Sequence, residues 1–234
     1  EPPIVITYPD TVRSLTPDFY YRLGEPLEAT VAVDDVGSND GTYNDQLTPQ
    51  PSMICDSDTS KLFQPGKAGI SQPLSNNGTA ASFSCLINWS GSTGAYQWIT
   101  AENSNWFSGN RIQLGMFQNN WAIVITNAGD SSRWFTTSIS CGLPIGVDTH
   151  LTYVIDGTSV RIYLNKVLSV DISSSIALTP SVEPFGIGYD NGSDTLNGGL
   201  DEFAFYQKAL TQTDVDALVD SWNAGCAVAP PQAD

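Results

Sequence analysis

The stretch GGLDEFAFYQKALTQTDVDALVDSW, residues 198–222, contains the two periodicities on which the fold prediction rests. In its first half, Phe203 and Phe205 alternate with Glu202 and Ala204, which predicts a strand over Leu200–Tyr206. In its second half, apolar residues recur at the spacing of one helix face, at Val215, Leu218, Val219 and Trp222. We therefore predict a strand followed by a short helix whose apolar side packs on the protein.

The predicted helix has signals at both of its ends. Thr211 is a suitable N-cap residue, and Asp214 follows at the spacing of a capping box. Gly225 lies where a glycine commonly ends a helix. These signals predict a helix over Gln212–Ser221 that stops before Gly225.

Four stretches resemble, in order and spacing, the laminin-G-like and pentraxin-like modules of the concanavalin A-like lectin/glucanase superfamily. The closing stretch is similar to a strand reading roughly I-D-E-x-x-I-Y followed by x-x-A-L-[ST], matched here by Leu200, Asp201, Glu202, Phe203, Tyr206, Ala209, Leu210 and Thr211. The other stretches are Tyr20–Glu25 with Asp34 and Gly41–Tyr43, then Ser82–Trp89, then His150–Asn165. The resemblance implies an all-β, concanavalin A-like jelly-roll sandwich of two antiparallel sheets with one short C-terminal helix.

The length of 234 residues suits one domain of this kind. We expect an extended N-terminal arm over residues 1–10, because Pro2 and Pro3 oppose a helix there. The jelly-roll domain is predicted over residues 11–226. The proline-containing end, residues 227–234, is expected to be a flexible tail or linker.

The net charge is −16, from 25 acidic and 9 basic residues. A chain with this charge is repelled by phosphate backbones, so nucleic acid is excluded as an expected partner. No apolar run approaches the length of a membrane span. The four cysteines, Cys55, Cys85, Cys141 and Cys226, are too widely spaced for a zinc ribbon, and both disulfides and free buried thiols remain open for them.

The sequence favours a protein that is not an enzyme. His150 is the only histidine, and its place on a predicted strand favours a structural role over a catalytic one. Glycosidases of related fold carry an E-x-D-x-x-E strand, and this chain has no such stretch. Asp201 and Glu202 are adjacent on a predicted strand, so we expect them to point to opposite faces rather than to act together.

A calcium ion is expected from the resemblance, because in many family members it ties the opening loop to the closing strand. The matching positions are Asp34, Asn39 and Asp201, which supply the oxygen ligands that calcium prefers. The alternative is that both aspartates only cap turns.

Two tryptophans are candidates for ligand contact. Trp106 and Trp134 lie at or near predicted loop tips among polar residues, where an aromatic ring can support a sugar. The alternative for each is packing in the core.

The opening stretch, from Tyr20–Glu25 to Gly41–Tyr43, resembles modules in structural proteins of tailed bacteriophages. This resemblance implies a non-catalytic attachment or decoration module of a virion tail, fibre or capsid, with glycan binding and with other virion or surface proteins as partners. We expect it on a virion surface or outside the cell, within a homo-oligomer or larger assembly. The alternative is a secreted, lectin-like carbohydrate-binding accessory domain or a degenerate glycoside hydrolase.

Overall fold

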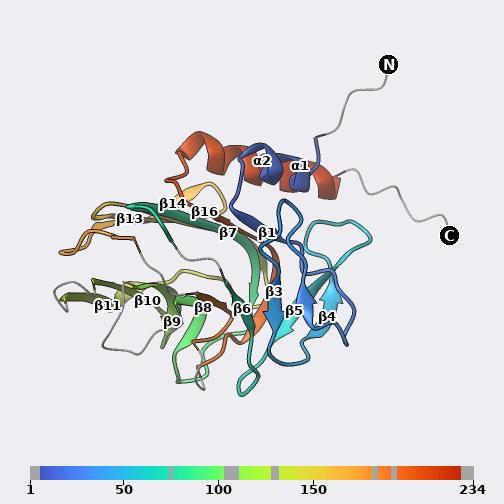
Figure 1. Cartoon of the computed structure of the whole chain (residues 1–234), viewed down its shortest axis with the longest axis horizontal. Coiled ribbons are helices and arrows are strands. Elements are labelled where there is room, and N and C mark those ends of the chain that lie inside the picture. The colour runs from blue at the N-terminus through green and yellow to red at the C-terminus, as the bar shows by residue number, and fades with distance from the viewer. Residues whose placement is uncertain are drawn as a thin grey trace.

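The computed structural model describes residues 6–73, 76–102, 111–127, 132–180, 184–190 and 194–227. Its strands form two antiparallel sheets, named A and B, that pack face to face, and helices α1 and α2 lie on the outer side of sheet A (Figure 1). Helix α1 spans Tyr8–Ser14 and helix α2 spans Gln212–Ala227. The predicted all-β jelly-roll sandwich with a C-terminal helix is confirmed.

Sheet A contains the strand of the closing stretch at its centre. Its order is β14 (Val167–Ser173), β13 (Ser159–Leu164), β12 (Asp148–Asp156), β7 (Ala80–Trp89), β16 (Gly198–Tyr206), β5 (Thr59–Phe63) and β4 (Thr48–Pro51), and β1 (Phe19–Tyr21) also pairs with β16. Strand β16 is buried along its whole length, because the other sheet covers one face and the helices cover much of the other.

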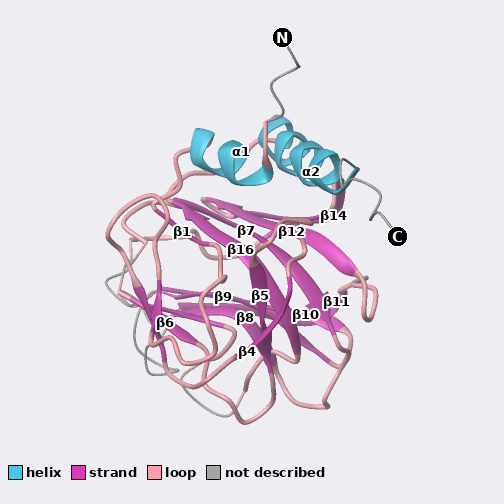
Figure 2. Cartoon of the chain, turned by 90° about the vertical axis from the view of Figure 1, so that its right-hand side faces the viewer, coloured by secondary structure: helices cyan, strands magenta, loops and turns pink. Residues whose placement is uncertain are grey.

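Sheet B lies on the opposite side of the sandwich from the helices (Figure 2). Its order is β11 (Ser132–Ser140), β10 (Asn120–Asn127), β9 (Arg111–Phe117), β8 (Gln97–Glu102), β15 (Phe185–Ile187), β6 (Ile70–Gln72), β3 (Gly41–Tyr43) and β2 (Val31–Ala32). Within the described ranges, neither helix covers its outer face.

The main core lies between the two sheets and is built by residues at alternate positions of each strand. On β7 these residues are Phe83, Cys85, Ile87 and Trp89, as the sequence predicts. On β9 they are Ile112, Leu114 and Met116. Because the side-chain period of a strand is two, the residues between them point outward.

Six strands were absent from the sequence prediction, namely β2, β3, β4, β5, β6 and β14. Strand β14 is an edge strand in which only Val170 is fully buried, so it lacks a clear apolar alternation. Strand β5 contains the buried Lys61, whose Nζ donates to the backbone oxygen of Glu25. Residues 176–178, whose apolar Ile176 and Leu178 alternate as in a strand, form no strand.

Helix α1 corrects the prediction of an extended arm over residues 1–10. The helix begins at Tyr8, and its capping box joins the Thr7 hydroxyl to the backbone N–H of Asp10. Pro9 lies in the first turn, where proline is tolerated because the first helical N–H groups have no helical partner. Residues 1–5 lie outside the described ranges.

Helix α2 continues past the predicted stop at Gly225 and ends at Ala227. Its start is as predicted, with the Thr211 hydroxyl accepting from the backbone N–H of Asp214. Its last turns are fixed by a disulfide between Cys226 and Cys55. The predicted end at Gly225 is therefore wrong, because a covalent link to a distant loop holds the helix beyond the glycine.

Candidate functional site

The outer face of sheet B carries a group of aromatic rings. Phe117 of β9 and Phe135 of β11 point outward, and Tyr96 lies just before β8. The Tyr96 and Phe117 rings stack with centroids 4.4 Å apart, and Phe135 lies 6.3 Å from Tyr96 and is 36% exposed. We call Tyr96, Phe117 and Phe135 the aromatic shelf. It places apolar ring surface at the solvent boundary of a sheet with no helix over its described part.

Two buried polar groups lie on the same outer face as the shelf. Trp98 of β8 stacks beneath Tyr96, with centroids 5.5 Å apart and planes 2° from parallel. Its indole Nε1 has no hydrogen-bond partner among the described residues, and the same holds for Oε1 of Gln113 on β9. Buried polar atoms are usually paired, so these two solvent-inaccessible atoms are exceptions beneath the shelf.

A hydrogen-bonded trio extends this face toward strands β3 and β6. The Asn44 Nδ2 donates to Ser71 Oγ at 2.7 Å and to the Tyr189 hydroxyl at 2.7 Å. The Tyr189 ring lies across β15 at Gly186, where a Cβ atom would be 3.2 Å from the ring. Glycine at this position therefore allows the tyrosine to lie flat on the sheet.

Carboxylates are absent from the described outward side chains of the strands around the shelf. The described outward positions of β8, β9 and β10 are Trp98, Ala101, Gln113, Gly115, Phe117, Asn120, Ala122, Val124 and Thr126. Glycoside hydrolysis in most families needs two carboxyl groups about 5 to 9.5 Å apart. The described part of this face lacks that pair.

The two tryptophans chosen from the sequence have different outcomes. Trp106 lies outside the described residues. Trp134 is partly buried and packs against the main core, as in the packing alternative, and its contact with a ligand stays a prediction. The physical reason is the strand period: Trp134 pairs with the inward Ile125, whereas Phe135 pairs with the outward Val124.

The predicted calcium ligands fall into two hydrogen-bond networks. The Asp34 Oδ1 accepts from the backbone N–H groups of Tyr20 and Val36, and its Oδ2 accepts from that of Asn39 at 3.0 Å. Asp201 instead accepts from the backbone N–H of Met53 at 2.8 Å. The structure thus brings Asp34 and Asn39 together, and Asp201 has other partners.

Among the described residues, no three acidic, histidine or cysteine side chains converge on one metal position. The three predicted ligands therefore do not form one ligand set in this arrangement, and the hydrogen bonds of Asp34 are those of the turn-capping alternative. Calcium binding stays a prediction.

Asp201 and Glu202 are buried at a β-bulge that was not predicted from the sequence. The register of β16 against β7 shifts between Asp201 and Ala204, and Glu202 has a φ of 53°. Burial raises the pKa of Asp201 to about 8 and raises the pKa of Glu202 well above its usual value. Arg22 Nε donates to Glu202 Oε1 at 3.1 Å. The bulge corrects the expectation of opposite faces, because Glu202 is the extra residue between the outward Asp201 and the inward Phe203.

His150 has a structural environment beneath the helices. It is fully buried, its Nε2 lies 3.0 Å from the hydroxyl of Tyr8 of α1, and its ring is 6.4 Å from Trp222 of α2. Burial lowers the pKa of His150 to about 3, so the ring is neutral near pH 7. This supports the structural role predicted for it.

The sequence matches the family model described as the concanavalin A-like lectin/glucanases superfamily over residues 64–216. The match covers more than half of the 234 residues. The chain belongs to this superfamily. No curated protein matches the sequence significantly.

Solved structures with a similar fold come from several kinds of protein. A Trypanosoma rangeli sialidase in complex with the inhibitor DANA is similar with a TM-score of 0.63 and 10% identity, over 86% of this chain and 32% of that chain. Domain 4 of AbnA, a GH43 extracellular arabinanase from Geobacillus stearothermophilus in complex with arabinotriose, is similar with a TM-score of 0.63 and 18% identity. The match covers 86% of this chain and 97% of that chain. The binding domain of botulinum neurotoxin serotype D is similar with a TM-score of 0.63 and 14% identity, over 90% of this chain and 52% of that chain.

This superfamily member spans about a third of the sialidase chain and about half of the toxin binding domain, but nearly all of the arabinanase domain. At these identities the likeness shows the fold alone. Function must therefore be argued from the site. No helix in the described ranges is long and apolar enough to cross a membrane.

Proposed function

We propose that this chain is a non-catalytic carbohydrate-binding module for surface attachment or decoration, with the aromatic shelf of sheet B as its ligand site. The observation that carries the proposal is the partly exposed aromatic shelf, in which Phe135 is 36% exposed, on a sheet face that neither described helix covers. Sugar rings have an apolar face of C–H groups that packs on aromatic rings, and their hydroxyls need hydrogen-bond partners nearby. The Asn44 and Ser71 side chains supply polar groups on the same face.

The absence of catalysis is part of the proposal. It is supported by the lack of a carboxylate among the described outward side chains of β8 to β10 and by the burial of Asp201 and Glu202, which expose 1% and 0% of their surface. Release of reducing ends from β-glucans, galactans and chitin is expected to stay at background. Turnover that a single Asp or Glu substitution abolishes would show that the chain is an enzyme.

The cellular setting is proposed to be a virion surface or another extracellular surface. The disulfide between Cys55 and Cys226 supports an oxidising environment. The sequence resemblance to bacteriophage structural modules supports a virion, where other virion proteins would be the partners. The alternative, a secreted accessory domain, is supported by the similar size and fold of the arabinanase domain that was solved with arabinotriose.

Carbohydrate binding is tested in two steps. A glycan array with wild-type protein identifies a binding sugar, and its affinity is then measured for Tyr96→Ala and Phe135→Ala. Each variant is expected to lose about tenfold or more in affinity, since a lost aromatic contact is worth about 1.4 kcal/mol. Val167→Ala is the matched control, because Val167 is 69% exposed on β14 of the other sheet. Equal losses in all three variants, or no bound glycan, would contradict the proposal.

A further inference from the structure

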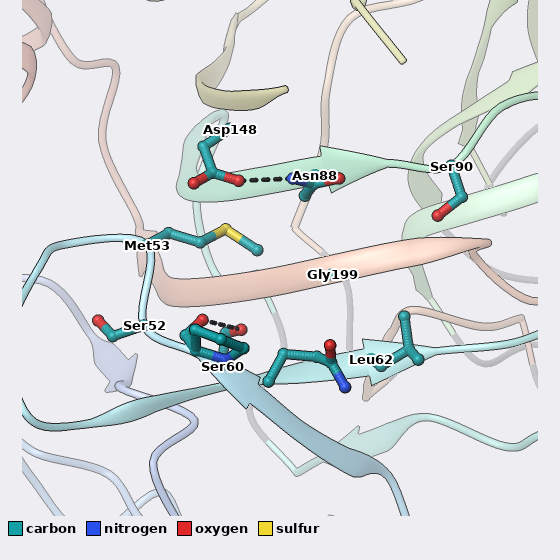
Figure 3. Close-up of a pocket in the computed structure, with 10 residues that line it drawn as sticks. Ser52, Met53, Ser60, Leu62, Asn88, Ser90, Asp148 and Gly199 are labelled. Atoms are coloured by element: carbon teal, nitrogen blue, oxygen red, sulfur yellow. Dashed lines mark hydrogen bonds between the residues drawn. The ribbon is translucent and has the colours of Figure 1, made fainter. Parts of the chain in front are cut away.

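A cavity with a volume of about 360 Å³ lies on the outer face of sheet A, away from the aromatic shelf (Figure 3). One row of paired residues crosses five strands beneath it, namely Asp148 on β12, Asn88 on β7, Gly199 on β16, Leu62 on β5 and Thr48 on β4. All of these except Thr48 line the cavity. The cavity is thus built on neighbouring strands of one sheet.

Gly199 lies in the middle of this row and has no side chain. A Cβ atom at Gly199 would lie 2.7 Å from the Cε of Met53, which also lines the cavity. A side chain at this position would therefore occupy the floor of the cavity. Asn88 and Leu62 lie on the strands on either side of Gly199, as Figure 3 shows.

The hydrogen bonds of the lining residues leave acceptors free. The Asn88 Nδ2 donates to Asp148 Oδ1 at 2.6 Å, and the Gln50 Nε2 donates to the backbone oxygen of Pro49 at 2.9 Å. Ser60 Oγ donates to the backbone oxygen of Pro51 at 2.9 Å. The amide oxygens of Asn88 and Gln50 and the second oxygen of Asp148 accept no hydrogen bond from the described residues. A ligand that donates hydrogen bonds is the one this lining can satisfy.

The charge of the lining adds to this preference. Asp148 is the only charged residue among the ten that line the cavity, and it is exposed at the cavity mouth. The chain as a whole carries −16, so anions are repelled and cations attracted. Pro51, Met53 and Leu62 supply apolar surface for the carbon skeleton of the ligand.

We infer that this cavity binds an unacetylated amino sugar, with its ammonium group at Asp148 and its hydroxyls at the amide oxygens of Asn88 and Gln50. A volume of about 360 Å³ is at the lower end of the usual range for small-molecule sites, which suits one sugar ring. The site is separate from the aromatic shelf, because the two lie on opposite outer faces of the sandwich. Its success or failure is therefore independent of the proposed function.

The two methionines of the chain, Met53 and Met116, provide a direct readout. Met53 lines the cavity, and Met116 is buried in the core between the sheets. In protein labelled with ¹³C at the methionine methyl groups, glucosamine hydrochloride is expected to shift the Met53 signal in a saturable way and to leave the Met116 signal unchanged. Glucose and N-acetylglucosamine, at the same ionic strength, are expected to bind at least tenfold more weakly, because neither carries an ammonium group.

Two variants on one strand separate local from general electrostatics. Asp148→Asn removes the proposed ammonium partner and is expected to weaken glucosamine binding at least tenfold. Asp156→Asn is the matched control, because Asp156 ends the same strand roughly 26 Å away and is exposed. A folded Asp148→Asn protein, checked by its melting curve, is required for the comparison.

The inference is overturned by any of four results. These are a Met53 signal that does not move with glucosamine, equal binding of glucose, equal shifts of both methionines, and equal weakening by Asp148→Asn and Asp156→Asn. The last result would assign the binding to the net charge of the chain rather than to the cavity.

Discussion

The outer faces of the two sheets carry similar aromatic side chains and use them differently. Tyr206 on the outer face of sheet A is fully buried beneath the helices, whereas Phe135 on the outer face of sheet B is 36% exposed. On sheet A, helices α1 and α2 add a second hydrophobic core, which contains Val12, Leu218 and Tyr206. An aromatic ring on a strand therefore becomes part of the core or part of a surface according to what lies above it, and not according to its residue type.

The largest expected effect tests whether the helices are needed on sheet A. Leu218→Ala removes a fully buried side chain from the apolar stripe of α2, and the free energy of unfolding is expected to fall by about 2 to 5 kcal/mol. Phe135→Ala on the open face is expected to cost about 1 kcal/mol or less. Denaturant melts of both variants measure the difference. Equal losses would show that the two faces do not differ as described.

A smaller effect is expected at the boundary between the two sheets. Asp34 bonds to the N–H of Tyr20 in sheet A and to loop N–H groups between strands of sheet B. Asp34→Ala leaves these donors unpaired, so we expect a loss of about 1 to 3 kcal/mol even in chelator.

The same two proteins, melted with calcium and with chelator, test the predicted calcium site. If the predicted ion binds, the wild-type protein has a higher melting temperature in calcium than in chelator. Its free energy of unfolding is expected to rise by about 2.7 kcal/mol at a calcium concentration of a hundred times Kd. The variant should not gain this increment, and sodium at equal ionic strength should not reproduce it. Identical wild-type melts with chelator and calcium would contradict the calcium prediction and leave Asp34 with its hydrogen bonds alone.

The smallest effect concerns pH and the covered face. His150 has a pKa of about 3 when folded and about 6.5 when unfolded, so below pH 6.5 the unfolded chain binds a proton that the folded chain does not. Its contribution to stability is therefore lost as pH falls from about 6.5 toward 3, by at most about 1.4 kcal/mol per pH unit. Asp201, with a folded pKa raised to about 8, acts in the opposite direction.

Comparison with a variant isolates the histidine from the other groups. His150→Gln keeps a hydrogen-bonding side chain beside Tyr8 but does not titrate. As the pH falls from 7 to 5, the free energy of unfolding of the wild type is expected to decrease relative to that of the variant, because only the wild type loses the contribution of His150. The same slope in both proteins would show that His150 is accessible to protons in the folded state.

The fold was predictable from the sequence wherever one periodicity continued for several turns or residues. Helix α2 and strand β7 are examples, because Val215 to Trp222 and Phe83 to Trp89 each mark one buried face. Helix α1 was missed although Thr7 and Asp10 form a capping box, because seven residues give too short a pattern. The bond between Cys55 and Cys226 joins positions 171 residues apart, so only the tertiary structure selects it.

The candidate site was less predictable than the fold. Tryptophan was chosen for its chemistry, but the strand period places Trp134 inward and its neighbour Phe135 outward. The alternation of Ile112, Leu114 and Met116 could have identified Phe117 as outward. The bulge at Glu202 had no sequence signal, because glutamate rarely adopts a left-handed backbone.

The disulfide also determines how the domain would carry mechanical load. Tension applied at the end of α2 enters at Cys226 and passes directly to Cys55, so the chain between these residues is shielded. The load then runs through β4, β3, β2, β1 and α1 to Ile6. The aromatic shelf lies on strands within the shielded loop. A module that holds a surface under tension would therefore keep its binding face intact until the short segment before Cys55 gives way.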